Sequence, residues 1–177
     1  MSDFNDRVIV TGKPRGTISK YQPLVLFLTP LLAILFQIYV PRFVAYLAFL
    51  DLPLLVTIYF AFMRRSPIAG LFLGAGIGLV QDALSDQPLG MFGIVKTLVG
   101  YLAAGFSQRF ASETAMLRIG VAFAFYLGHQ FLYWTLQRAL LGLPVSFDPG
   151  RVLLLGVLNA LVAAPLFLLL DKLRDRG

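Results

Sequence analysis

The chain of 177 residues has no cysteine, one histidine and few charged residues. Without cysteine it forms neither a disulfide framework nor a thiolate metal site, and one histidine alone does not make a metal site. Charged residues are 14% of the chain, against about a quarter in soluble domains, and 58% of the residues are hydrophobic. With a mean hydropathy of +0.80, the sequence predicts an integral membrane protein that holds no metal and no cofactor.

The sequence also lacks the common enzyme motifs, because it contains no phosphate-binding loop, no Ser/His/Asp arrangement and no zinc signature. We therefore predict no catalytic residues. The one pair worth testing for an enzyme within the membrane is Asp82 with His129. The net charge of +6 does not indicate nucleic acid binding, since the basic residues lie at the ends of apolar segments and not on a soluble domain.

Six apolar segments approach the length of about 17 to 25 residues that crosses a bilayer. They are Pro23–Val40, Phe43–Met63, Ile68–Leu84, Leu89–Phe106, Ala115–Leu136 and Val152–Leu170. We predict an all-α membrane protein whose six transmembrane helices lie within residues 21–171. Residues 1–20 and 172–177 are predicted to be cytoplasmic tails, and residues 137–151 a loop.

The distribution of lysine and arginine predicts the orientation of these segments. If the N-terminus is cytoplasmic, eleven of the fifteen basic residues lie on the cytoplasmic side and three on the outer side. The fifteenth, Lys96, lies within an apolar segment. Because cytoplasmic loops of membrane proteins are enriched in basic residues, both termini are predicted to be cytoplasmic.

Two segments carry small residues at four-residue spacing, which places those residues on one face of a helix. Such faces let helix backbones approach closely in lipid. They pack either against other helices of the same bundle or against the transmembrane helix of a partner. The predicted partner-binding residues are Gly70, Gly74, Gly78, Gly120, Ala124 and Gly128.

Asp51, Gln81, Asp82 and Lys96 form a predicted polar cluster in the outer part of the bilayer. A charge at membrane depth needs a partner, and either Asp51 or Asp82 lies at a depth that meets Lys96. One interpretation is an ion pair that fixes helix register, or Lys96 extending to the surface. The other is an outward polar site for a ligand or a proton relay. His129 is expected to be a hydrogen-bonded structural residue.

Several motifs of the central hairpin and its neighbours are typical of one family. They are Asp51-Leu52-Pro53-Leu54-Leu55 and Ile58-Tyr59, the hairpin elements Gly78–Ser85, Pro88-Leu89-Gly90 and Lys96–Leu102, and Asn159-Ala160-Leu161, Pro165 and Leu170–Leu173. In these residues the chain resembles the MreD family of rod shape-determining integral membrane proteins. The resemblance extends over roughly residues 23–173. Lys96 is a departure, because the resemblance implies a neutral or less basic residue there.

The resemblance implies a non-enzymatic, multi-pass component of the cell-elongation machinery for peptidoglycan synthesis in the bacterial inner membrane. It would scaffold the complex by binding the transmembrane segment of an MreC-like single-span protein. Through that protein it would be linked to MreB, RodA and a class B penicillin-binding protein. The resemblance also implies a fold similar to the substrate-binding subunits of energy-coupling-factor vitamin transporters. A small-molecule-binding or transport subunit that uses the outward polar cluster is therefore the second hypothesis.

Overall fold

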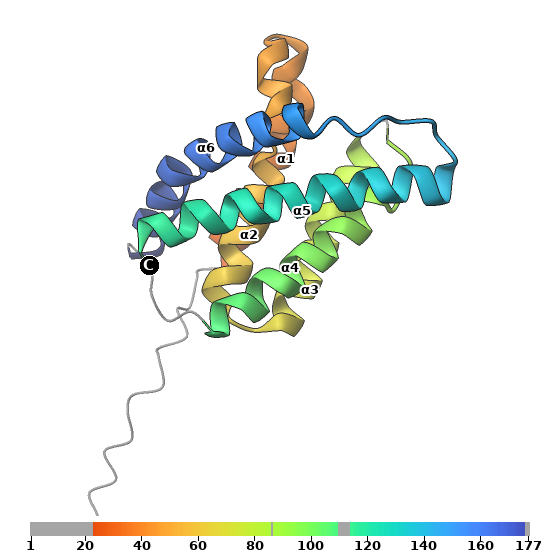
Figure 1. Ribbon diagram of the computed structural model, residues 1–177. Coiled ribbons are helices and arrows are strands. Elements are labelled where there is room, and N and C mark those ends of the chain that lie inside the picture. The colour runs from red at the N-terminus through yellow and green to blue at the C-terminus, as the bar shows by residue number, and fades with distance from the viewer. Residues whose placement is uncertain (1–22, 86, 110–113, 176–177) are drawn as a thin grey trace, which may run out of the picture.

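The computed structural model describes residues 23–85, 87–109 and 114–175, in which all regular secondary structure is helical (Figure 1). The elements are α1 (Pro23–Tyr39), η1 (Val40–Arg42), η2 (Ala45–Phe49), α2 (Leu52–Arg64), α3 (Pro67–Leu84), α4 (Met91–Arg109), α5 (Ala115–Leu141) and α6 (Pro149–Asp175). The predicted all-α class is confirmed. The predicted N-terminal tail, residues 1–20, lies outside the described residues.

Four helical segments are long and apolar enough to cross a membrane, which supports the membrane class. They are Leu24–Arg42, Ala45–Arg64, Pro67–Leu84 and Pro149–Leu173. Helices α4 and α5 coincide with the other two predicted segments but contain the buried polar residues Lys96 and His129. That these two helices also cross the membrane stays a prediction.

The second predicted segment is not one continuous helix, contrary to the expectation for Phe43–Met63. The short helix η2 ends at Phe49, and α2 begins after Asp51. The Asp51 side chain accepts a hydrogen bond of 2.9 Å from the Leu54 amide, and Pro53 lies in the first turn of α2. Aspartate is a preferred N-cap, and proline is tolerated in the first turn because no amide partner is needed there. The Asp51 carboxylate therefore lies at the start of a helix.

The loop predicted over residues 137–151 is shorter in the structure. Helix α5 continues to Leu141 and ends at Gly142, whose φ of 63° is left-handed and is typical of a residue that follows a helix. Helix α6 begins at Pro149, where Oδ1 of Asp148 accepts a 3.1 Å hydrogen bond from the Arg151 amide. At its other end, α6 continues without a break through Pro165 and beyond the predicted end of the span at Leu170.

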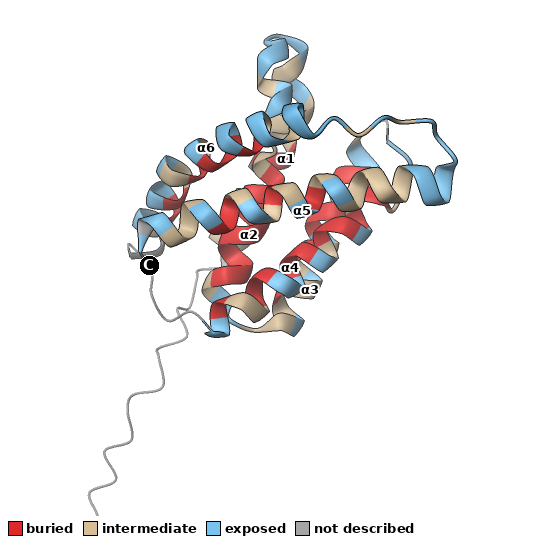
Figure 2. Ribbon diagram, viewed as in Figure 1, coloured by how far each residue is buried: buried red, intermediate tan, exposed pale blue. Residues whose placement is uncertain are grey.

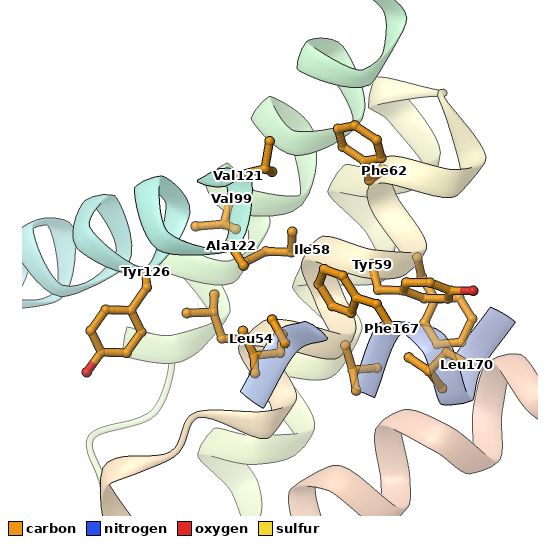
Figure 3. Packing of buried hydrophobic residues seen from close by; sticks show 14 of the residues in the cluster. Leu54, Ile58, Tyr59, Phe62, Val99, Val121, Ala122, Tyr126, Phe167 and Leu170 are labelled. Atoms are coloured by element: carbon orange, nitrogen blue, oxygen red, sulfur yellow. The ribbon is translucent and has the colours of Figure 1, made fainter. Parts of the chain in front are cut away.

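Helix α2 is at the centre of the bundle (Figure 2). Its residues from Pro53 to Phe62 are all buried. With 13 residues α2 is shorter than a spanning helix needs to be, but neighbouring helices surround it and separate it from lipid. Its apolar side chains pack with residues of α4, α5 and α6, among them Val99, Tyr126 and Phe167 (Figure 3).

Helices α3 and α4 form the predicted hairpin, and they meet backbone to backbone. Gly70, Gly74 and Gly78 all face α4 and are buried. A Cβ atom at Gly74 would overlap the carbonyl oxygen of Lys96, and one at Gly70 would overlap that of Gly100. This glycine face therefore packs within the bundle, which is one of the two uses that its spacing predicts.

Candidate functional site

Asp51 is the centre of a polar network that joins several elements of the bundle. Nζ of Lys96, on α4, lies 3.2 Å from Oδ1 and 3.4 Å from Oδ2 of Asp51. Nε2 of His129, on α5, lies 3.7 Å from Oδ2 of the same carboxylate. The Lys96 side chain is fully buried, whereas 16% of the Asp51 side chain is exposed. Of the two partners considered for Lys96, the structure places Asp51 beside it.

Asn159, on α6, holds the chain in the break between η2 and α2. Its Oδ1 accepts a 2.8 Å hydrogen bond from the Asp51 amide, and its Nδ2 donates one of 2.9 Å to the Phe49 carbonyl. Backbone groups outside a helix need such partners when they are buried. Asn159 therefore fixes the position from which Asp51 reaches Lys96.

Asp82 has a different role, because its carboxylate binds the start of α4. Oδ2 accepts hydrogen bonds from the amides of Gly90 at 3.0 Å and Gly93 at 2.8 Å, and Oδ1 accepts one of 3.0 Å from Phe92. The first amides of a helix have no partners within it, and the positive end of the helix dipole favours a carboxylate. Both oxygens thus bind backbone amides, which does not favour Asp82 as the acid or base of an Asp82–His129 pair.

A cavity of about 530 Å³ lies beside the Asp51 network. Residues of α1, η2, α3, α4, α5, α6, the break between η2 and α2 and the connection between α5 and α6 line it. Its polar lining includes Gln37, Asp51, Gln81, His129, Gln130 and Gln137, and its aromatic lining includes Phe49, Phe92, Tyr126, Tyr133, Trp134 and Phe147. The cavity is at the end of the bundle that the distribution of basic residues assigns to the outside.

Two buried side chains in the cavity wall have polar atoms without a hydrogen-bond partner. Within the described chain, Oε1 of Gln81 and both ring nitrogens of His129 have no hydrogen-bond partner, although both residues are less than 5% exposed. A buried polar group without a partner costs about 1 to 3 kcal/mol. Since both residues line the cavity, a bound molecule with donors and acceptors would satisfy them.

Aromatic rings stack against His129 and narrow the same cavity. The Phe92 and Tyr133 rings are 4.9 Å apart and nearly parallel, and each is stacked 6.2 Å from the His129 ring. Nε1 of Trp134 donates a 2.9 Å hydrogen bond to the Val145 carbonyl, which fixes the α5–α6 connection beside the opening. The walls are therefore held in place by their own contacts.

The second small-residue face, on α5, is placed differently from the one on α3. Gly120, Ala124 and Gly128 are all exposed. A Cβ atom at Gly120 or Gly128 would meet no atom within 4 Å. In the part of the chain that the structure describes, no helix packs on this face.

A family model described as rod shape-determining protein MreD matches residues 17–173. The chain belongs to the MreD family. No curated protein and no solved structure matches it. The match confirms the resemblance in the sequence and, together with the four apolar helices, identifies a membrane protein of a family named for determining rod shape. Similarity to vitamin-transporter subunits stays a prediction.

In this MreD chain, His129 is the site residue whose position the sequence did not predict. Its expected hydrogen bonds are not found among the described residues, and it lies instead against Asp51. Its position could have been predicted from the sequence, because Tyr126, His129, Gln130, Tyr133 and Gln137 are spaced at three and four residues and therefore share one face of a helix. All five line the cavity. This arrangement is suited to polar recognition of a segment or molecule in the cavity.

Proposed function

We propose that this MreD protein is a non-enzymatic scaffold of the cell-elongation machinery, located in the bacterial inner membrane with both termini in the cytoplasm. It binds the transmembrane segment of an MreC-like single-span protein. Through this partner it is linked to MreB, RodA and a class B penicillin-binding protein in peptidoglycan synthesis. The observation that carries the proposal is the exposed face of Gly120, Ala124 and Gly128 on α5.

This face is suited to a helix because a partner backbone can approach it closely. Interfaces between transmembrane helices are enriched in small residues for this reason. The corresponding face on α3 is unavailable, since its glycines already contact α4. The proposed partner helix therefore docks on α5 rather than on the hairpin.

The cavity extends the proposed interface toward the outer surface. His129, Gln130, Tyr133 and Gln137 line it from the side of α5 opposite the small-residue face, so the outer juxtamembrane segment of the partner would reach the opening by passing around the end of α5. A peptide backbone offers amide donors and carbonyl acceptors, which is what the unpartnered atoms of Gln81 and His129 lack.

The helix interface is tested by Ala124→Leu, with co-purification of the MreC-like protein in mild detergent as the measurement. Ala124 is exposed, so we expect the variant to fold with an unchanged melting temperature and to lose the partner. Gly105→Leu is the matched control, because a side chain at Gly105 on α4 also meets no neighbouring atom. An Ala124→Leu variant that retains the full amount of partner would overturn the proposed interface.

Gln81→Leu tests the part played by the cavity. Removing a buried polar atom that has no partner is expected to raise the melting temperature of the isolated protein. If the cavity binds the juxtamembrane segment, the same substitution lowers the affinity for the MreC-like protein. Higher stability with unchanged affinity would exclude Gln81 from the interface.

The second candidate function is that of a small-molecule-binding or transport subunit, and the polar cavity is the observation that favours it. A ligand that binds only the folded protein raises its stability by mass action. This function predicts a small molecule that raises the melting temperature of the isolated chain, and a loss of that effect in Gln81→Leu. If the protein is a scaffold, only the partner protein raises its melting temperature.

A further inference from the structure

A second cavity, of about 630 Å³, lies on the lipid-facing side of the bundle between α1 and α3. Phe27 of α1 and Phe72 of α3 border it and are 76% and 70% exposed. Gly76 also lines it, and a Cβ atom there would meet nothing within 4 Å. The absence of a side chain at Gly76 therefore helps to keep the groove open.

Eleven of the twelve residues that line this groove are apolar, and the twelfth is Arg64 at the end of α2. Arg64 is exposed, and its side chain forms no hydrogen bond or ion pair with another residue in the described part of the chain. Its guanidinium group can bind a phosphate through two parallel hydrogen bonds. The groove thus combines a long apolar surface with a cation at one end.

The length of the groove corresponds to one leaflet of a bilayer. Along α3 it extends from Ala69 to Val80, about 16 Å at a rise of about 1.5 Å per residue. The hydrocarbon core of a bilayer is about 30 Å thick, so each leaflet contributes about 15 Å. A transmembrane partner helix would need a groove that continued through both leaflets.

Arg64 also lies at the end of the groove that the distribution of basic residues assigns to the cytoplasm. The cytoplasmic leaflet contains anionic lipids, and basic pockets between transmembrane helices on that side bind their headgroups. We propose that the groove binds one acyl chain of an anionic phospholipid from the cytoplasmic leaflet, with the lipid phosphate paired to Arg64. This site is separate from the outward cavity and from the small-residue face of α5.

The test is titration of the delipidated, full-length protein with phosphatidylglycerol or phosphatidylcholine of identical chains, read by native mass spectrometry. We expect one phosphatidylglycerol to bind at least tenfold more tightly than phosphatidylcholine. Arg64→Gln should remove that preference. Gly76→Leu, which fills the groove, should weaken the binding of both lipids at least tenfold.

Two substitutions outside the groove are the matched controls. Arg109→Gln removes a basic residue at the end of α4, and Gly105→Leu adds a side chain at another open helical glycine. Both should bind phosphatidylglycerol as the wild type does. If the wild type binds the two lipids equally, or if Arg64→Gln and Arg109→Gln weaken phosphatidylglycerol binding equally, the lipid binds non-specifically and the proposal is overturned.

A protein helix in the groove would give a different result. Gly76→Leu would then release a co-purifying membrane protein and leave lipid binding unchanged, which also overturns the proposal. Because Arg64→Gln changes an exposed residue, it tests the headgroup contact even if Gly76→Leu fails to fold. Neither substitution alters the α5 face, so failure of the lipid site leaves the scaffold hypothesis intact.

Discussion

Replacement of Asp51 by asparagine leaves Lys96 as a fully buried cation without a carboxylate partner. The substitution keeps a side-chain oxygen that can accept the Leu54 amide, so the cap of α2 is retained. The main change is therefore the loss of a charge 3.2 Å from Nζ of Lys96. Removal of one partner of a buried ion pair costs about 3 to 5 kcal/mol, whereas replacement of both by apolar groups is often neutral.

We expect Asp51→Asn to lower the free energy of unfolding by about 3 kcal/mol, which raises the unfolded fraction on the order of 100-fold. Lys96→Met should cost less, because the Asp51 side chain is 16% exposed and the Lys96 side chain is not exposed at all. The double variant should recover most of the stability that Asp51→Asn loses. Its apolar methionine fills the space of a lysine stem that is already buried.

The assay is reversible unfolding in mixed detergent micelles, followed by the fluorescence of Trp134, the single tryptophan of the chain. The wild type, both single variants and the double variant form a double-mutant cycle, which isolates the interaction between the two side chains. If the double variant is as unstable as Asp51→Asn, an unpaired Lys96 is not the cause of the loss, and the reasoning is refuted.

Three further substitutions test other contacts of the bundle. Asp82→Ala removes the acceptor of three backbone hydrogen bonds at the start of α4, so it should lower the free energy of unfolding by at least about 3 kcal/mol in the same assay. The control Asp148→Ala, at an exposed helix cap, should lower it by about 1 kcal/mol. Equal losses in the two variants would contradict the role of Asp82 in holding α4. Gly74→Leu should abolish the folded peak in size-exclusion chromatography because its side chain would displace α4, whereas Gly105→Leu should keep it. Asp171→Asn weakens the hydrogen bonds to a tyrosine of α2 and an arginine of α5 and should lower the melting temperature, which differential scanning calorimetry would measure.

The hairpin was the most predictable part of the fold. Its polar turn, its apolar flanks and the glycine spacing of α3 all indicate two closely packed helices. The face on α5 has the same spacing, yet it is exposed. The difference depends on the opposing helix, since α4 presents Gly100 to Gly70 and no such neighbour faces α5 in the described structure. Spacing within one helix contains no information about its neighbour.

The residues of the polar cluster could be predicted from the sequence, but which of them form an ion pair could not. Asp51 and Asp82 fall at similar depth, so depth alone could not decide which of them meets Lys96. The deciding factor was the start of α4, whose amides need acceptors close to the turn and are bound by Asp82. The break at Asp51 could have been read from an aspartate two residues before Pro53, because both residues favour a helix start. The cavity depends on the arrangement of several helices, which no local pattern describes.

The hydrogen bonds between α6 and the α2 region have a structural consequence. Helices α5 and α6 pack mainly on each other, α3 and α4 pack mainly on each other, and α2 contacts helices of both pairs. At the outer end, the Asp51 amide is tied to Asn159 of α6, and at the opposite end the Tyr59 hydroxyl donates to Asp171 of the same helix. Helix α6 is thus tied to the α2 region by hydrogen bonds at two separate points, and residues from both sides of this junction line the cavity. A molecule that fills this cavity therefore contacts α6 together with Asp51 at the start of α2.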